Sequence, residues 1–172
     1  MSTEPKPLLK LPADVTTRLF RLIETQIRTN DVLAGCVKTW QTWLGEPGDK
    51  LPPTIGATPW LCLTPAPSGE SWFSPEAQIG ILQVRIDAYV RGTCVDDVLN
   101  LWGAIRTALS PYARTAVDGG PCFGKKLTDA GAHKGVVLMT HPLVDPAPDP
   151  GGDGAFKATG MISVEYRALA RS

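Results

Sequence analysis

Cys122, Asp129 and His133 are the residues whose types and spacing could support nucleophilic chemistry. A cysteine thiol becomes a strong nucleophile when an imidazole takes its proton, and a carboxylate can orient that imidazole. Here only their proximity along the chain supports such a grouping. We expect that the protein is not an enzyme, and we keep a small cytoplasmic cysteine-dependent enzyme as an alternative.

A metal site would have to combine the two histidines, His133 and His141, with a ligand such as Cys122 or Asp129. Their spacing fits no zinc pattern. None of the four cysteines belongs to a C-x-x-C pair, and we expect all four to be small buried apolar side chains with free thiols: Cys36, Cys62, Cys94 and Cys122. We therefore expect no metal and no other cofactor.

The segment RGTCVDD, residues 91–97, joins a strand to a helix, which is a common position for a phosphate site. It lacks the glycine pattern of such sites, and Asp96 and Asp97 occupy the first helical turn. A phosphate would meet two carboxylates there, so this junction indicates a capped helix. Thr93 is the expected cap, with Asp96 three residues later.

The elements on either side of this junction have clear periods. Residues 81–91 alternate as a strand whose faces differ, with five apolar residues on the core face: Leu82, Val84, Ile86, Ala88 and Val90. Gly92 ends the strand. The helix that follows presents an apolar stripe and stops at Ser110-Pro111: Val95, Val98, Leu99, Trp102, Ile105 and Leu109.

The rest of the chain predicts an α+β fold: a mainly antiparallel sheet of about five strands with two helices packed on one face. A first helix begins after Asp14 and buries Leu19, Leu22, Ile23 and Ile27. The other strands are expected at 37–43, 58–65, 135–144 and 156–169, with a loop over 65–77. Residues 1–12 are expected to form an extended arm, and 13–172 one domain with long loops at 111–133 and 145–155.

Composition excludes several classes of protein. The 172 residues carry 17 basic and 17 acidic side chains, a formal net charge of zero, which argues against a dedicated nucleic-acid binder. No stretch of 18 apolar residues is present to span a membrane, and the N-terminal sequence lacks the apolar run of a signal peptide. We expect a protein that is made in the cytoplasm and has no membrane partner.

The sequence resembles the tail terminator (tail completion) proteins of long-tailed bacteriophages. The residues that carry the resemblance are the strand QVRIDAYVRG, the turn TCVDD and the helix VLNLWGAIRTALSP, within residues 78–111. The N-terminal helix DVTTRLFRLIETQI and the last long strand MISVEYRA fit the same layout. The loops at 111–133 and 145–155 depart from it.

The resemblance implies a structural virion protein that forms a ring, usually a hexamer, in the neck of the tail. Such a ring caps the completed tail tube, stops its growth and joins it to the head-tail connector or head-closure protein. DNA passes through without sequence-specific binding, and near-neutral charge suits that role because a basic lumen would hold phosphates. A head-closure protein or a tube subunit remains an alternative.

Two sets of residues are expected to make contacts with partners. Trp40 and Trp43 fall on opposite faces of one strand, so one of them is expected to face away from the core. The expected subunit interface consists of these tryptophans and of the polar face of the 81–91 strand: Trp40, Trp43, Arg85, Asp87, Tyr89 and Arg91. A basic set in the 111–133 loop is expected to face a partner or the lumen: Arg114, Lys125 and Lys126.

Overall fold

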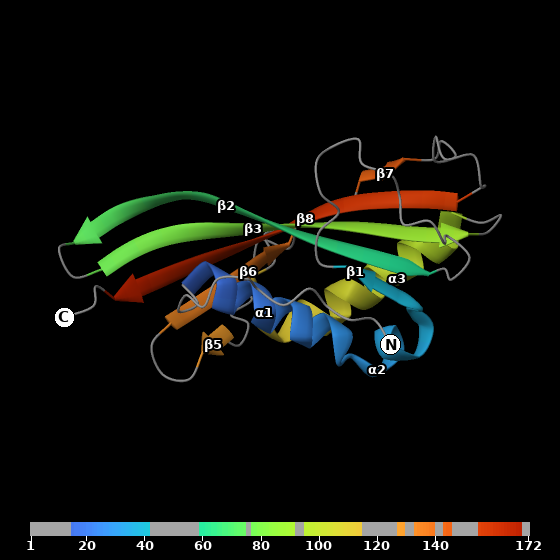
Figure 1. Ribbon diagram of the computed structural model, residues 1–172, viewed down its shortest axis with the longest axis horizontal. Coiled ribbons are helices and arrows are strands. Elements are labelled where there is room, and N and C mark those ends of the chain that lie inside the picture. Colours follow the sequence, from blue (N-terminus) through green and yellow to red (C-terminus); the bar gives the residue numbers. More distant parts are fainter. Residues whose placement is uncertain are drawn as a thin grey trace, which may run out of the picture.

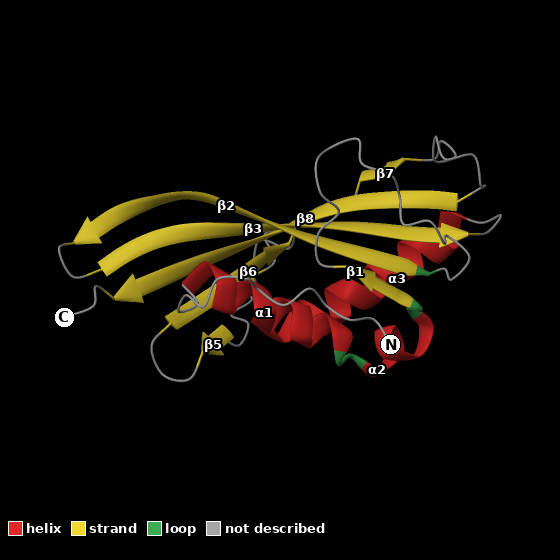
Figure 2. Ribbon diagram, viewed as in Figure 1, coloured by secondary structure: helices red, strands yellow, loops and turns green. Residues whose placement is uncertain are grey.

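The computed structural model describes residues 15–41, 59–74, 77–91, 95–114, 127–129, 133–139, 143–145 and 155–169. These residues form a two-layer α+β fold in which the helices lie on one side of a curved sheet (Figures 1 and 2). The helical elements are α1 (Val15–Arg28), α2 (Asp31–Cys36), α3 (Val95–Leu109) and the 3-10 turn η1 (Ser110–Tyr112). The strands are β1 (Thr39–Gln41), β2 (Trp60–Ser74), β3 (Ala77–Arg91), β4 (Ala113–Arg114), β5 (Leu127–Asp129), β6 (His133–Met139), β7 (Leu143–Asp145) and β8 (Ala155–Leu169).

Four antiparallel strands, in the order β2-β3-β8-β6, form the body of the sheet. The expected number of about five was therefore wrong for the body, although the mainly antiparallel character is confirmed. Strands of two or three residues complete the sheet. β1 pairs in parallel with β2, and β4 in parallel with β6, whereas β5 pairs antiparallel with β6 and β7 antiparallel with β8. Such short strands are too brief to show an alternating pattern in the sequence.

The face of the sheet toward the helices carries the core. All five apolar residues expected on this face of β3 are buried, and they pack against α1 and α3. The neighbouring strands contribute Leu61 and Leu63 from β2, and Ile162 and Val164 from β8. Because β3 pairs with both strands along its length, one alternating pattern fixes the side-chain orientation of all three.

Two glycines in the sheet make room for large aromatic side chains of the core. A Cβ atom on Gly160 of β8 would collide with the indole of Trp102 from α3, and one on Gly80 of β3 would collide with the Tyr166 ring. Both aromatic residues are buried. The helix α3 therefore sits close to the sheet at Gly160 because no side chain separates them.

The apolar stripe of α3 differs from the expectation at one position. Val98, Trp102 and Ile105 are buried as expected, but Leu99 is 45% exposed and Leu101 is buried in its place. Each residue advances about 100° around a helix, so 98, 101, 102 and 105 share a face while 99 lies beside it. In α1 the expected residues are buried or half-buried.

A further short helix, α2, follows α1 where the sequence suggested only the end of the first helix. Asn30 lies between the two helices, and its Oδ1 accepts a 3.2 Å hydrogen bond from the Leu33 amide. This is the N-cap arrangement that asparagine favours. Six residues are too few to establish a helical period in the sequence, which is why α2 was missed.

Strand β2 continues through the segment that was expected to be a loop. Pro65 and Pro67 suggested an end to the strand, yet β2 pairs with β3 as far as Ser74, with irregular register after Ser68 and Trp72. Proline lacks an N–H and is tolerated in a strand where the nitrogen faces away from the neighbouring strand. Beyond Cys62, β3 is the only strand that pairs with β2 among the described residues, so these prolines lie on an edge.

The loops at 111–133 and 145–155 are only partly as expected. The first contains η1, β4 and β5 in its described residues, and β7 ends at Asp145 where the second was expected to begin. The expected strand 135–144 is divided into β6 and β7, which pair with different parts of β8. Residues 1–12, 115–126 and 146–154 lie outside the described residues.

Candidate interface on the outer sheet face

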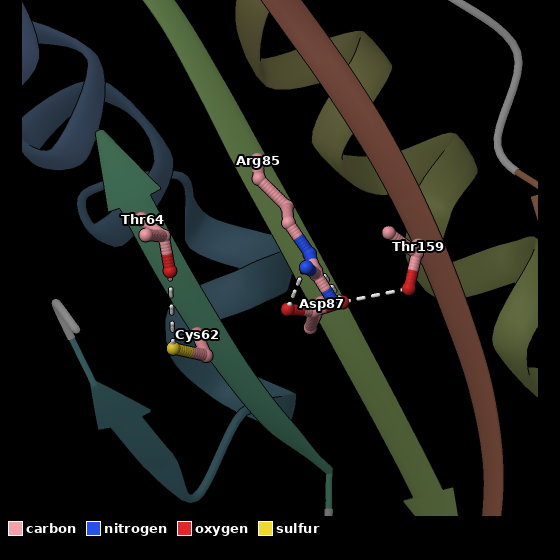
Figure 3. Close-up of polar contacts among 5 residues, drawn as sticks. All are labelled: Cys62, Thr64, Arg85, Asp87 and Thr159. Carbon is pink, nitrogen blue, oxygen red and sulfur yellow. Dashed lines mark hydrogen bonds and ion pairs between the residues drawn. The ribbon is translucent and has the colours of Figure 1, made fainter. Parts of the chain in front are cut away.

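The side of β3 opposite the helices carries Ile81, Gln83, Arg85, Asp87 and Tyr89. Together with their neighbours on β2 and β8, these residues form the outer sheet face. Register places Cys62 and Thr159 on either side of Asp87, and Thr64 and Met161 on either side of Arg85. These cross-strand rows place side chains of three strands next to one another (Figure 3).

A buried carboxylate lies at the middle of this face. The Asp87 side chain is only 5% exposed, and its Oδ1 accepts a 2.6 Å hydrogen bond from the Thr159 hydroxyl. Arg85 Nε lies 3.0 Å from Asp87 Oδ2, and its Nη2 donates a 3.1 Å hydrogen bond to Oδ1 (Figure 3). Side chains of two strands thus donate hydrogen bonds to the Asp87 carboxylate, and these bonds offset the cost of burying its charge.

The Arg85 guanidinium is held in place by Asp87 but is not enclosed by it. The Arg85 side chain is 49% exposed. Its Nε and Nη2 contact the carboxylate, and no contact with another described residue engages Nη1. A guanidinium has five N–H donors in a rigid plane, so this one presents oriented donors to solvent. The arrangement can recognise a carboxylate of a partner.

One end of the outer sheet face is closed. Trp60 and Tyr89 are register partners on β2 and β3, and their ring centroids are 4.3 Å apart with the planes tilted by 43°. With Cys62 they form a second buried cluster, separate from the main core. The expectation that Cys62 is a small buried side chain is confirmed, and Cys36 is partly buried.

The other end of this face is open. Ile81 is 38% exposed and Met161 is 37% exposed, although both are large and apolar. Glu165, the register partner of Ile81, is exposed as well. Exposed apolar residues next to an oriented arginine are typical of protein contact surfaces, which are enriched in methionine and arginine.

The residues expected at a subunit interface have different positions. Arg85 is half exposed, whereas Asp87 and Tyr89 are buried within the chain, so Arg85 is the member that presents side-chain atoms to a partner. Trp40 of β1 is half-buried against the core, with the Arg28 guanidinium 5.6 Å from its ring centroid. The remaining predictions concern side chains outside the described residues: Trp43, Arg91, Arg114, Lys125 and Lys126.

The candidate catalytic group is only partly described. Asp129 and His133 are register partners in the β5–β6 hairpin, while Cys122 lies outside the described residues. Among the described residues, no group of three or more His, Cys, Asp or Glu side chains is placed to hold a metal ion. None of the described helices has the length and hydropathy that a membrane span requires.

Sequence reasoning missed the β8 contribution to this face. Thr159 and Met161 lie on the final strand, and nothing in their local sequence indicates which residues of β3 they adjoin. The signal would have been the antiparallel register of β3 and β8, which depends on tertiary packing. The alternation of β8 alone does place both residues on the polar face of that strand.

No protein-family model matches this sequence, and no curated protein matches it. Among solved structures, the backbone of this chain is similar to that of a chain in "Virion of native gene transfer agent (GTA) particle". That likeness has a TM-score of 0.44 at 13% sequence identity and covers 88% of this chain and 92% of the other. The two chains therefore have few identical residues at aligned positions.

Proposed function

We propose that this protein is a structural component of a phage-like virion, and specifically a tail terminator. It forms a ring, of six copies as in the family it resembles, on the end of the completed tail tube. The ring stops tube growth and joins the tube to the head-tail connector or head-closure protein. DNA passes through the ring without sequence-specific binding.

The observation that carries this proposal is the succession of β3 and α3, which both lie beside β8. Strand β3 ends at Arg91, and α3 begins at Val95 with Asp96 and Asp97 in its first turn. The helix ends at Leu109, and η1 follows with Ser110 and Pro111. These are the elements on which the sequence resemblance to tail terminators rests, and α1 and β8 occupy the remaining positions of that layout.

The packing of this unit suits a structural role. Val98, Trp102 and Ile105 of α3 are buried against the sheet, and the outer sheet face has an oriented arginine at its open end. A rigid two-layer plate with a polar and apolar contact surface can be joined to copies of itself. Each ring contact would need to bury about 800 Å² per partner to be stable.

The direct test is to let particles assemble in the absence of this protein. Without a terminator, tubes should exceed their normal length and should fail to join heads, as measured by electron microscopy of lysates. Labelled protein should then be found at one end of each tube. Label along the whole tube would favour a tube subunit, and tails of normal length that join heads would overturn the proposal.

The cysteine-dependent alternative has its own test. Rapid alkylation of Cys122 by iodoacetamide in the folded protein, with a depressed thiol pKa, would favour the enzyme. A thiol that reacts no faster than an ordinary cysteine would count against it. The same protein sample can be used for native mass spectrometry, where a closed ring is the result expected of a terminator.

We also propose that the arm at 1–12 and the basic loop contact the tube or the connector. Replacement of residues 115–126 by a Gly-Ser-Gly-Ser linker tests the loop and leaves β4 and β5 intact. Arg114 pairs with Leu138 and Leu127 with Gly135, so the linker must span roughly 10 Å along β6. Head joining should be lost while the unfolding temperature is retained, and infectious particles of normal yield would refute the role.

A further inference from the structure

Large exposed apolar side chains occur on both layers of the described structure. Ile81 and Met161 lie on the outer sheet face, at 38% and 37% exposure. Leu99 of α3 and Val32 of α2 belong to the helical layer on the opposite side, at 45% and 65% exposure. Exposed apolar side chains on opposite layers, such as Met161 and Leu99, can be covered together if one copy of the chain packs against the next.

The charged side chain next to Met161 on the sheet and the one next to Leu99 on α3 are opposite in sign. On the outer sheet face, Arg85 is fixed by Asp87 and turns its remaining donors to solvent. On α3, Asp96 and Asp97 are exposed in the first turn, and neither makes an ion pair with another described residue. Complementary charge selects one docking orientation over others and speeds association.

The spacing of charge and apolar group matches on the two surfaces. Arg85 and Met161 are register partners, so their Cβ atoms lie about 5 Å apart. Asp96 and Leu99 are three residues apart on one helix, which also places their Cβ atoms about 5 to 6 Å apart. An arginine-methionine pair on the sheet can therefore meet an aspartate-leucine pair on α3.

Gly103 adds an independent indication that another molecule approaches α3 closely. It is exposed in the interior of the helix, one turn after Leu99, and a Cβ built there would meet no atom within 4 Å. A glycine at such a position costs roughly 1 kcal/mol relative to alanine. No contact within the described chain requires it, but the bare backbone gives a flexible side chain such as methionine room to pack.

We propose that the outer sheet face of one copy docks on α3 of a second copy, with Arg85 and Met161 of the first meeting Asp96 and Leu99 of the second. This inference rests on the proposed ring and identifies its contact surfaces. Because the two surfaces differ, the contact is head-to-tail and each copy engages two neighbours. Such a contact gives a ring if its rotation closes, and an open filament if it does not.

A charge exchange tests the inference with the full-length protein. Arg85→Glu and Asp96→Arg should each weaken self-association by at least about tenfold, because each places like charges in the contact. The double variant Arg85→Glu/Asp96→Arg should recover most of the loss, since the pair is restored in reverse. Association is measured by sedimentation velocity and native mass spectrometry over a range of protein concentrations.

Lys38→Glu is the matched control for Arg85→Glu, because Lys38 is exposed, lies outside the outer sheet face and undergoes the same change of charge. It should assemble as the wild type does. Arg85→Glu places a second carboxylate beside Asp87 and could disturb folding, so Leu99→Ser provides a second variant. Leu99 is 45% exposed, and its replacement should weaken assembly while the thermal unfolding midpoint stays within about 4 °C of the wild type.

The outcomes separate this inference from the proposed function. A wild type that assembles, with single variants that assemble equally well, would overturn the docking surfaces and leave the ring intact. Loss of binding to tubes or connectors without loss of self-association would assign α3 to a different partner and would also overturn the inference. If the purified chain is monomeric, the same variants are scored by incorporation on isolated tail ends. Absence of wild-type protein there would overturn both proposals.

Discussion

The Thr159 hydroxyl donates a 2.6 Å hydrogen bond to Asp87 Oδ1, and this contact connects β8 to β3 across the outer sheet face. The two residues are register partners although they are 72 positions apart in the sequence. Asp87 is 4% exposed, so its carboxylate depends on partners within the chain, Thr159 and Arg85 among them, for hydrogen bonds that water would otherwise supply. The contact therefore orders both the sheet and the arginine that faces solvent.

Thr159→Val should destabilise the protein by roughly 1.5 to 3 kcal/mol, because it removes a partly buried hydrogen bond to a charged acceptor and preserves the shape of the side chain. Thr107→Val is the matched control: its hydroxyl donates to the Gly103 carbonyl on an exposed part of α3. That change should cost less than about 0.5 kcal/mol. Urea unfolding of both variants gives the comparison, and equal losses would show that the Asp87 contact contributes little.

Gly160→Ala should be strongly destabilising, whereas Gly103→Ala should be stabilising. The new methyl group at Gly160 would collide with the buried Trp102 indole, and overpacking of this kind costs about 1 to 3 kcal/mol. At Gly103 the methyl group meets open space, and the helix gains roughly 0.5 to 1 kcal/mol. Thermal unfolding of both variants at a concentration where neither associates measures the effects. A stable Gly160→Ala protein would show that α3 can shift from the sheet.

The sequence predicts the core of this fold well because β3 and β8 have strict alternation over long runs. All five apolar positions of β3, and Ala158, Ile162, Val164 and Tyr166 of β8, are buried as that pattern requires. It fails for β2, where Pro65 and Pro67 suggest an end but lie on an edge that tolerates them. It also fails for α2 and for the short strands, whose formation depends on a cap or on β6 and β8 as partners.

The candidate interface is less predictable than the core for a physical reason. Alternation separates the two faces of β3 but does not show which parts of the polar face are exposed. Asp87 and Tyr89 are buried because Thr159 and Trp60 adjoin them, and both neighbours come from other strands. Of the polar residues that were predicted at the interface and are described, only Arg85 has a side chain that is about half exposed, whereas Asp87 and Tyr89 are buried.

Leu101→Ala and Leu99→Ala should differ sharply although the residues are two positions apart. Leu101 is 6% exposed in the core, and its truncation should cost about 2 to 4 kcal/mol. Leu99 is 45% exposed, and its truncation should change the stability of the single chain by less than about 1 kcal/mol. Chemical denaturation at low protein concentration measures both. Comparable losses would place Leu99 in the core, against the orientation of α3 described above.

Pro65 and Pro67 should protect the outer edge of β2 from pairing with another chain. Strand β1 pairs with β2 only over Trp60–Cys62, so the edge from Leu63 to Ser74 carries no other described strand. A row of outward N–H groups on such an edge is a template for association, and proline removes those donors. The two prolines are two positions apart, so both nitrogens face the same way, and the intervening Ala66 directs its N–H toward β3.

Pro65→Val/Pro67→Val should therefore convert this edge into an association site. The double variant restores two outward donors, and species larger than those of the wild type should appear as its concentration rises, measured by light scattering and thioflavin T fluorescence. Ala66→Val is the control, because it adds a β-branched residue to the same strand without adding an outward donor. If the double variant stays the same size as the wild type at every concentration, something other than these prolines protects the edge. If Ala66→Val associates equally, added hydrophobicity rather than backbone pairing is the cause.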